Sequence, residues 1–127
     1  MGKTDRNLRV LVVEDNLINQ IVMEGLLKTF GHDAVLVDNG RQAVQLSSDS
    51  AFDLILMDLH MPEMDGYETT EEIRNRESNG QTPIIAVTAD ALSGTKERCF
   101  EAGMDGYVTK PVDPDRLVAE ILRLTSA

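Results

Sequence analysis

The sequence predicts an α/β fold: a doubly wound, five-stranded parallel sheet with helices on both faces. Short apolar runs alternate with segments of helical spacing along the whole chain, and parallel strands need such crossover helices, which are right-handed. The apolar runs are unbroken, which is typical of strands buried on both faces. The chain has 127 residues, a length that suits one domain with its own core.

The first half of the chain carries three of the predicted strands, and the first of them covers Leu8–Val13. Asn16 caps the helix that follows, and Gly31 ends that helix. Four apolar residues form a stripe on this helix at helical spacing: Ile18, Ile21, Val22 and Leu26. The next elements are a strand over Ala34–Val37, a turn at Asp38-Asn39-Gly40, a helix over Arg41–Ser48 and a strand over Phe52–Met57.

The second half continues the alternation. Its elements are a polar helix over Tyr67–Glu77 ended by Asn79-Gly80, a strand over Pro83–Val87, a helix over Thr95–Ala102 ended by Gly103 and a strand over Gly106–Thr109. Asp113 caps the last helix and Pro114 takes its first position. The predicted inner face of this helix carries Leu117, Val118, Ile121 and Leu122. The domain is therefore expected over residues 8–125, and residues 1–7 are expected to be a disordered or cloning-derived tail.

Polar side chains directly follow four of the five predicted strands. Glu14-Asp15 follow the first strand and Asp58 follows the third. Thr88 and Lys110 follow the fourth and fifth. Because the carboxyl ends of parallel strands meet at one end of a sheet, where open α/β folds bind ligands, we expect one site built from these residues.

Three carboxylates in one pocket repel one another, because two unit charges at ~4 Å interact by about 4 kcal/mol at an effective dielectric constant near 20. Lys110 supplies one positive charge, and a hard divalent ion such as Mg²⁺, which prefers oxygen ligands, would supply two more. A carboxylate nucleophile beside Mg²⁺, a lysine and a hydroxyl is suited to phosphoryl transfer.

These residues resemble the receiver domain of two-component response regulators over nearly the whole chain. The matching positions are Glu14-Asp15 in LVVEDN, Asp58 in LILMDLHMPEMDG, Thr88 in PIIAVTA, Tyr107 in GMDGYVTKP, and Lys110-Pro111. The segments VVEDNLINQ, MDLHMPEMDGYE and EAGMDGYVTKP are most similar to receivers of hybrid sensor histidine kinases. The resemblance implies a flavodoxin-like (βα)5 fold with strand order 2-1-3-4-5.

The resemblance also implies roles at the predicted site. Asp58 would take a phosphoryl group from a phosphohistidine, and Asp15 and Asp58 would bind Mg²⁺ directly. The backbone carbonyl of His60 would be a third ligand, and Glu14 would act through water. Many members of the family have Asp at the position of Glu14, and the longer side chain alters this water-mediated contact.

The remaining implied roles belong to the switch. Lys110 would contact the phosphoryl group, Thr88 would be the switch hydroxyl, and Tyr107 would be the coupled aromatic residue that turns inward. The Lys110–Pro111 bond is usually cis in the family. The switched surface would involve the fourth helix, fifth strand and fifth helix, and the domain is expected to be a monomer or a weak dimer through that face.

Two other functions stay open on the sequence. A Mg²⁺-dependent phosphatase that forms an aspartyl-phosphate usually has a second Asp two residues after the nucleophile, where this chain has His60. A pseudo-receiver that only binds a partner typically lacks the residue equivalent to Asp58 or to Lys110, and both are present. On the receiver interpretation the domain catalyses only its own phosphorylation and dephosphorylation. The motifs favour part of a hybrid histidine kinase, and a single-domain response regulator stays open as the alternative.

The net charge of −10 and the absence of a basic stripe argue against direct nucleic-acid binding. No apolar run approaches the roughly 20 residues of a membrane helix, so no membrane contact by this segment is expected. Cys99 is the only cysteine, which favours a reducing compartment and a packing role, and His32 is expected at the surface. The expected partners are a histidine kinase domain, a histidine phosphotransfer protein, or both. The expected location is the cytoplasm, including the cytoplasmic part of a membrane sensor kinase.

Overall fold

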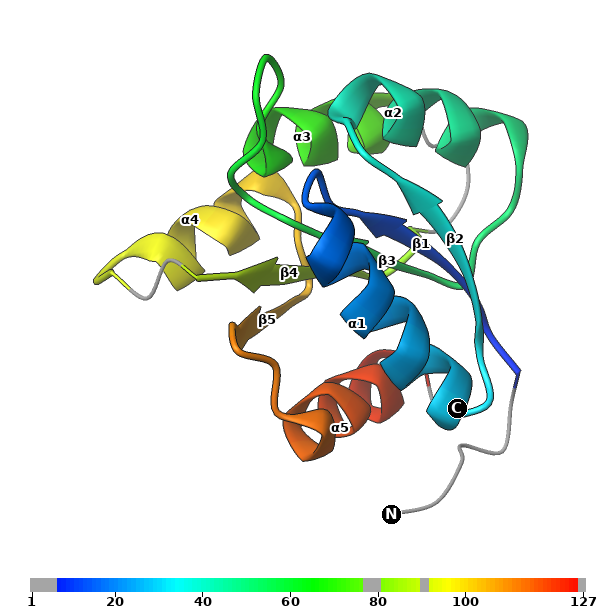
Figure 1. Ribbon diagram of the computed structural model, residues 1–127. Coiled ribbons are helices and arrows are strands. Elements are labelled where there is room, and N and C mark those ends of the chain that lie inside the picture. The colour runs from blue at the N-terminus through cyan, green and yellow to red at the C-terminus, as the bar shows by residue number, and fades with distance from the viewer. Residues whose placement is uncertain (1–6, 77–80, 90–91, 126–127) are drawn as a thin grey trace.

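The computed structural model describes residues 7–76, 81–89 and 92–125. In these residues five parallel strands form one sheet in the order β2-β1-β3-β4-β5, so the predicted fold and strand order are confirmed (Figure 1). The strands are β1 (Arg9–Val13), β2 (Asp33–Val37), β3 (Leu54–Met57), β4 (Ile84–Thr88) and β5 (Gly106–Thr109). Val13 is in register with both Val37 and Met57, so β1, β2 and β3 end level with one another.

Helices cover both faces of the sheet, and the sheet separates two hydrophobic cores. Helices α1 (Leu17–Thr29) and α5 (Pro114–Thr125) lie on one face, and α2 (Gly40–Asp49), α3 (Gly66–Arg76) and α4 (Thr95–Ala102) lie on the other (Figure 1). Cys99 is fully buried in the second of these layers, as its predicted packing role requires. No helix in the described ranges is both long and apolar enough to cross a membrane.

Element boundaries differ from the prediction by one or two residues, for local reasons. Strand β3 begins at Leu54 and not at Phe52. Just before the strand, it is the side-chain carboxylate of Asp53 that accepts the N–H of Arg9, at 2.8 Å. Strand β4 begins at Ile84, because the preceding proline has no N–H to donate. Glu77 and the predicted stop at Asn79-Gly80 lie outside the described residues.

The apolar stripe predicted on the first helix is not its buried face. Ile18, Ile21 and Val22 are 70%, 59% and 51% exposed, and only Leu26 of the predicted stripe packs against the core. The buried side chains of this helix are Met23 and Leu27. The helix carries two apolar stripes, and the one through Met23 and Leu27 faces the sheet. A smaller deviation of the same kind occurs on α5, where Leu122 is 41% exposed.

The expectation that His32 lies at the surface is wrong. Its side chain is buried, and Nδ1 accepts a hydrogen bond from the N–H of Leu8 at 3.0 Å. Gly31, with φ of 90°, turns the chain sharply after α1 and allows the N–H of His32 to reach the carbonyl of Leu27. Burial lowers the pKa of His32, so the neutral ring that accepts this bond is favoured.

Arg74 on α3 joins three segments at the amino end of the sheet. Its guanidinium donates to the carbonyls of Gly103 and Thr82 and pairs with the carboxylate of Asp105 at 2.8 Å. Arg74→Met should lower the free energy of unfolding by about 2–3 kcal/mol, because these acceptors lose a donor that is itself largely buried. Urea denaturation followed by circular dichroism measures the change. Arg76→Met, which removes an exposed arginine from the same helix, is the control, with an expected change within about 0.5 kcal/mol. Equal losses in the two variants would contradict the role given to Arg74.

Candidate functional site

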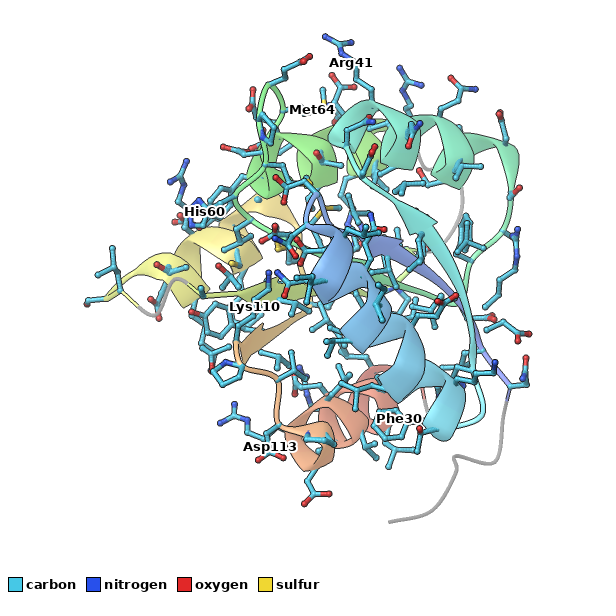
Figure 2. The ribbon with its side chains drawn as sticks, viewed as in Figure 1. Phe30, Arg41, His60, Met64, Lys110 and Asp113 are labelled. Carbon is cyan, nitrogen blue, oxygen red and sulfur yellow. The ribbon has the colours of Figure 1, made fainter. Side chains whose placement is uncertain are left out.

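The residues predicted to form the site lie at the carboxyl ends of four strands. Glu14 follows β1 and Asp58 follows β3, while Thr88 is the last residue of β4 and Lys110 follows β5. The strands are parallel, so their arrowheads point to the same side of the molecule, and the labelled Lys110 lies there (Figures 1 and 2). The predicted convergence is therefore present in the structure.

Three carboxylates form a cluster at this end of the sheet. Glu14, Asp15 and Asp58 each present an oxygen, and these oxygens lie within 4.8 Å of one another. Glu14 and Asp58 are 5% and 6% exposed, whereas Asp15 faces solvent. The cluster is therefore open to solvent on the side of Asp15. Its carboxylate oxygens are hard ligands of the kind that Mg²⁺ prefers.

Lys110 reaches into this cluster from β5. Its Nζ lies 2.7 Å from Oε1 of Glu14 and 3.7 Å from Oδ1 of Asp58. The ammonium group therefore pairs closely with Glu14 and only loosely with Asp58. One lysine cannot balance three carboxylates, so the pocket carries an excess of negative charge.

The protonation of Asp58 reflects this imbalance. Burial, and then the nearby carboxylate of Glu14, raise the pKa of Asp58 to about 7. Lys110 and the N–H of His60, which donates to Oδ1 of Asp58 at 3.4 Å, lower it but do not compensate. A cation added to the cluster would favour the charged form of Asp58 and oppose this rise in its pKa.

The family model of the response regulator receiver domain matches residues 10–122. The chain belongs to this family. The receiver domain is 42% identical over 116 residues to the signal transduction histidine-protein kinase BarA of Escherichia coli, a match that covers 91% of this chain and 13% of that protein. With Histidine kinase 2 of Arabidopsis thaliana the match covers 12% of the relative, so the chain spans about one eighth of the length of these curated relatives.

A crystallised relative contains a bound metal ion. The receiver domain of a sensor histidine kinase from Pseudomonas aeruginosa is 41% identical to this chain and superimposes on it with a TM-score of 0.87. The match covers 96% of this chain and 100% of that one. That structure contains a magnesium ion coordinated in its active-site cleft. In this chain, the three acids within 4.8 Å of one another are the described residues whose carboxylates could hold such an ion.

Glu14 is held in place by groups that sequence analysis did not assign to the site. Its Oε2 accepts the N–H of Asn16 at 3.1 Å, and its backbone carbonyl accepts Nε2 of Gln20 at 2.7 Å. The Asn16 side chain caps α1, as predicted, by accepting the N–H of Asn19. Gln20 belongs to no recognisable sequence motif. It reaches Glu14 only because it lies one turn into α1.

The two predicted switch residues lie on neighbouring strands. Thr88 is fully buried, is in register with Thr109, and accepts the N–H of Lys110 at its carbonyl at 2.8 Å. Tyr107 is half-buried and packs against the core beneath α2, α3 and α4. The Lys110–Pro111 bond is cis, as the resemblance implies.

The segment after Asp58 folds back sharply before α3. The N–H of Met64 donates to the carbonyl of Pro62 at 2.8 Å, which closes a three-residue turn around Glu63, whose φ is 69°. The N–H of Gly66 then donates to the carbonyl of Leu59 at 2.9 Å. The reversal leaves His60 exposed and close to Asp58, on the side of the molecule where it is labelled in Figure 2.

Proposed function

We propose that Asp58 accepts a phosphoryl group from a phosphohistidine, in the presence of Mg²⁺. One observation carries the proposal: oxygens of Glu14, Asp15 and Asp58 lie within 4.8 Å of one another, with the ammonium of Lys110 in the same pocket. These residues come from β1, β3 and β5, so only the folded sheet brings them together.

The donor set fits a hard divalent cation. Asp15 and Asp58 are proposed as direct ligands, with Glu14 acting through water and the carbonyl of His60 as a further ligand. The raised pKa of Asp58, which burial and then the carboxylate of Glu14 cause, is consistent with this assignment, because a bound cation would favour the charged carboxylate. When bound, Mg²⁺ would offset the charge on the phosphoryl oxygens.

The chain's own groups account for the transfer. A carboxylate oxygen of unprotonated Asp58 forms the new bond to phosphorus while the bond from phosphorus to the imidazole nitrogen of the donor breaks, and the nitrogen keeps the electron pair. Lys110 exchanges its contact with Glu14 for a phosphoryl oxygen, and the hydroxyl of Thr88 donates to another oxygen. The leaving imidazole then takes up a proton.

Phosphorylation adds roughly −1.5 to −2 charge to the pocket. Lys110 and Thr88 are drawn toward that charge from the ends of β5 and β4, and Tyr107 takes the space that Thr88 vacates. The surface of α4, β5 and α5 is therefore the proposed output face, and the domain is proposed to be a monomer or a weak dimer through it.

The exposed apolar stripe on α1 is the proposed docking face for the phosphohistidine donor. Leu17, Ile18, Ile21 and Val22 are all more than half exposed, and α1 starts two residues after Asp15, so the stripe adjoins the acidic cluster. A receiver domain 31% identical to this chain has been solved in complex with a histidine phosphotransfer protein from Saccharomyces cerevisiae, with a TM-score of 0.85 and coverage of 94% and 90% of the two chains. The proposed occupant is therefore a domain of that class.

The similar histidine kinases suggest where the domain works. We propose that this chain is the receiver domain of a hybrid histidine kinase, because relatives named as histidine kinases contain a matching segment. The proposed location of this exchange is the cytoplasm, including the cytoplasmic part of a membrane sensor kinase.

Truncating the stripe should separate docking from chemistry. Ile18→Ala with Val22→Ala should slow phosphorylation by a histidine phosphotransfer protein by about 10- to 100-fold, because two aliphatic contacts at an interface are lost. Phosphorylation by acetyl phosphate should not change. Leu92→Ala, which truncates an equally exposed leucine elsewhere, should leave both rates as they are. A parallel loss with both donors would contradict a docking role.

Intact-mass spectrometry tests the proposed function. With acetyl phosphate and Mg²⁺ the protein should gain one phosphoryl group per chain, which hydroxylamine removes, and EDTA should prevent the gain. Steady-state hydrolysis of a simple phosphate ester would instead favour a phosphatase. A protein that neither binds Mg²⁺ nor gains mass would be a pseudo-receiver.

A further inference from the structure

We propose that Gly66 is a positioning residue for Asp58, an inference that rests on the proposed function. A side chain at residue 66 would overlap the carbonyl oxygen of Asp58, and its Cβ would lie 2.9 Å from Cα of Leu59. Gly66 is not among the glycines with positive φ. Glycine is therefore required here by the close approach of two backbones and not by its conformational freedom.

Hydrogen bonds hold the backbone on both sides of the peptide between Asp58 and Leu59. The N–H of Asp58 donates to the carbonyl of Val13 on β1 at 3.0 Å, and the carbonyl of Leu59 accepts the N–H of Gly66 at 2.9 Å. The first turn of α3 thus rests directly on the residue that carries the carboxylate. A displacement of this peptide would move Asp58 relative to Glu14 and Lys110, whose atoms lie within a few ångströms of it.

Helix α3 cannot yield by moving outward, because α2 lies against it. A Cβ at Gly40, the first residue of α2, would overlap Oγ1 of Thr69 and lie 3.0 Å from the side chain of Met64. Figure 2 shows Met64 beside the start of α2. Thr69 is fully buried, so the space between α3 and α2 is already filled. An added methyl group at residue 66 would therefore displace the backbone of Asp58 and not move α3 toward solvent.

Gly66→Ala is the test, with two matched controls. Gly25→Ala makes the same change on α1, where an added Cβ meets nothing within 4 Å. Asp65→Ala removes the carboxylate that accepts the N–H of Glu68 at 2.9 Å, and so loosens the same turn of α3 without adding an atom beside Asp58. Mg²⁺ affinity is measured by isothermal titration calorimetry without a phosphodonor, and the acetyl phosphate rate and the unfolding midpoint are measured separately.

The expected result is specific to Gly66→Ala. Its Mg²⁺ affinity and its phosphorylation rate should each fall at least tenfold, because a misplaced reacting group slows transfer steeply, while both controls stay within about twofold of wild type although Asp65→Ala lowers the unfolding midpoint. Wild-type values for Gly66→Ala, with only a lower midpoint, would overturn the proposal. Failure of the wild-type protein itself to bind Mg²⁺ or take up phosphoryl would overturn the proposed function instead.

If Gly66→Ala does not fold, the same measurements are made in the Gly25→Ala background, which should be about 1 kcal/mol more stable because alanine favours the helix over glycine. Loss of Mg²⁺ affinity in the folded double variant supports the proposal. If the double variant is still unfolded, the close contact between residue 66 and the backbone of Asp58 is needed for folding itself, and the positioning role is overturned.

Discussion

Asp58→Asn is expected to raise the free energy of unfolding by about 2–4 kcal/mol at pH 8 without divalent cations. In the folded protein burial and the carboxylate of Glu14 raise the pKa of Asp58 to about 7, against an ordinary value of 3.8, and every tenfold change in proton affinity corresponds to about 1.4 kcal/mol. Asn removes the charge and keeps the shape. The pairing of Lys110 with Glu14 at 2.7 Å needs no carboxylate at residue 58 and should persist.

The sign of the pH dependence follows from the same raised pKa. Between pH 3.8 and about 7 the folded protein holds a proton on Asp58 that the unfolded chain has lost, so the contribution of Asp58 to stability falls as pH rises through this window. The advantage of the Asn variant should therefore be absent near pH 3.8, grow with pH, and level off above pH 7.

Urea denaturation of both proteins at several pH values measures this difference. Asp115→Asn, at an exposed position on α5, should change stability by no more than about 0.5 kcal/mol at any pH. Saturating Mg²⁺ should reduce the difference in stability between Asp58→Asn and wild type, because the metal stabilises only the protein that binds it. An Asn variant that is less stable than wild type at pH 8 would contradict the crowding of charges in the pocket.

Lys110→Met is expected to slow phosphorylation by acetyl phosphate by about 10²–10³-fold, the usual loss when one stabilising donor to a reacting oxygen is removed. The fold places the ammonium group of Lys110 next to the carboxylates of Glu14 and Asp58. The same change removes a competitor of the metal, so Mg²⁺ should bind at least as tightly as to wild type.

The combination of slow chemistry and undiminished metal binding distinguishes a phosphoryl contact from a structural role. Calorimetry gives the Mg²⁺ affinity and intact-mass spectrometry the rate. Lys28→Met, which removes an exposed lysine from the far end of α1, should behave as wild type in both. A Lys110→Met variant that is phosphorylated at the wild-type rate would exclude Lys110 from the transfer.

The sequence predicted the meeting of Glu14, Asp15, Asp58 and Lys110 because it follows from strand direction alone. Each residue lies just after the end of a strand, and parallel strands end on the same side of a sheet. The close pairing of Lys110 with Glu14 could not be predicted, because it depends on how far two long side chains reach toward one another across the ends of β3 and β4.

Other features needed the packed structure. Helical spacing shows that Ile18, Ile21 and Val22 share a face but not which face meets the sheet, and here Met23 and Leu27 do so. His32 is buried because the turn at Gly31 brings it under Leu8, a contact between distant segments. Gly66 marks a turn in the sequence, yet its contact with the Asp58 peptide is visible only once α3 rests on β3.

Mapping the phosphoryl group to one residue tests the assignment of Asp58 most directly. After treatment with acetyl phosphate and Mg²⁺, reduction with borohydride converts an aspartyl-phosphate to homoserine, and peptide mass spectrometry locates it. The product is expected at position 58 alone and should be absent from Asp58→Asn. Modification of Asp15 or another acid instead, or undiminished uptake of phosphoryl by Asp58→Asn, would contradict Asp58 as the phosphoacceptor.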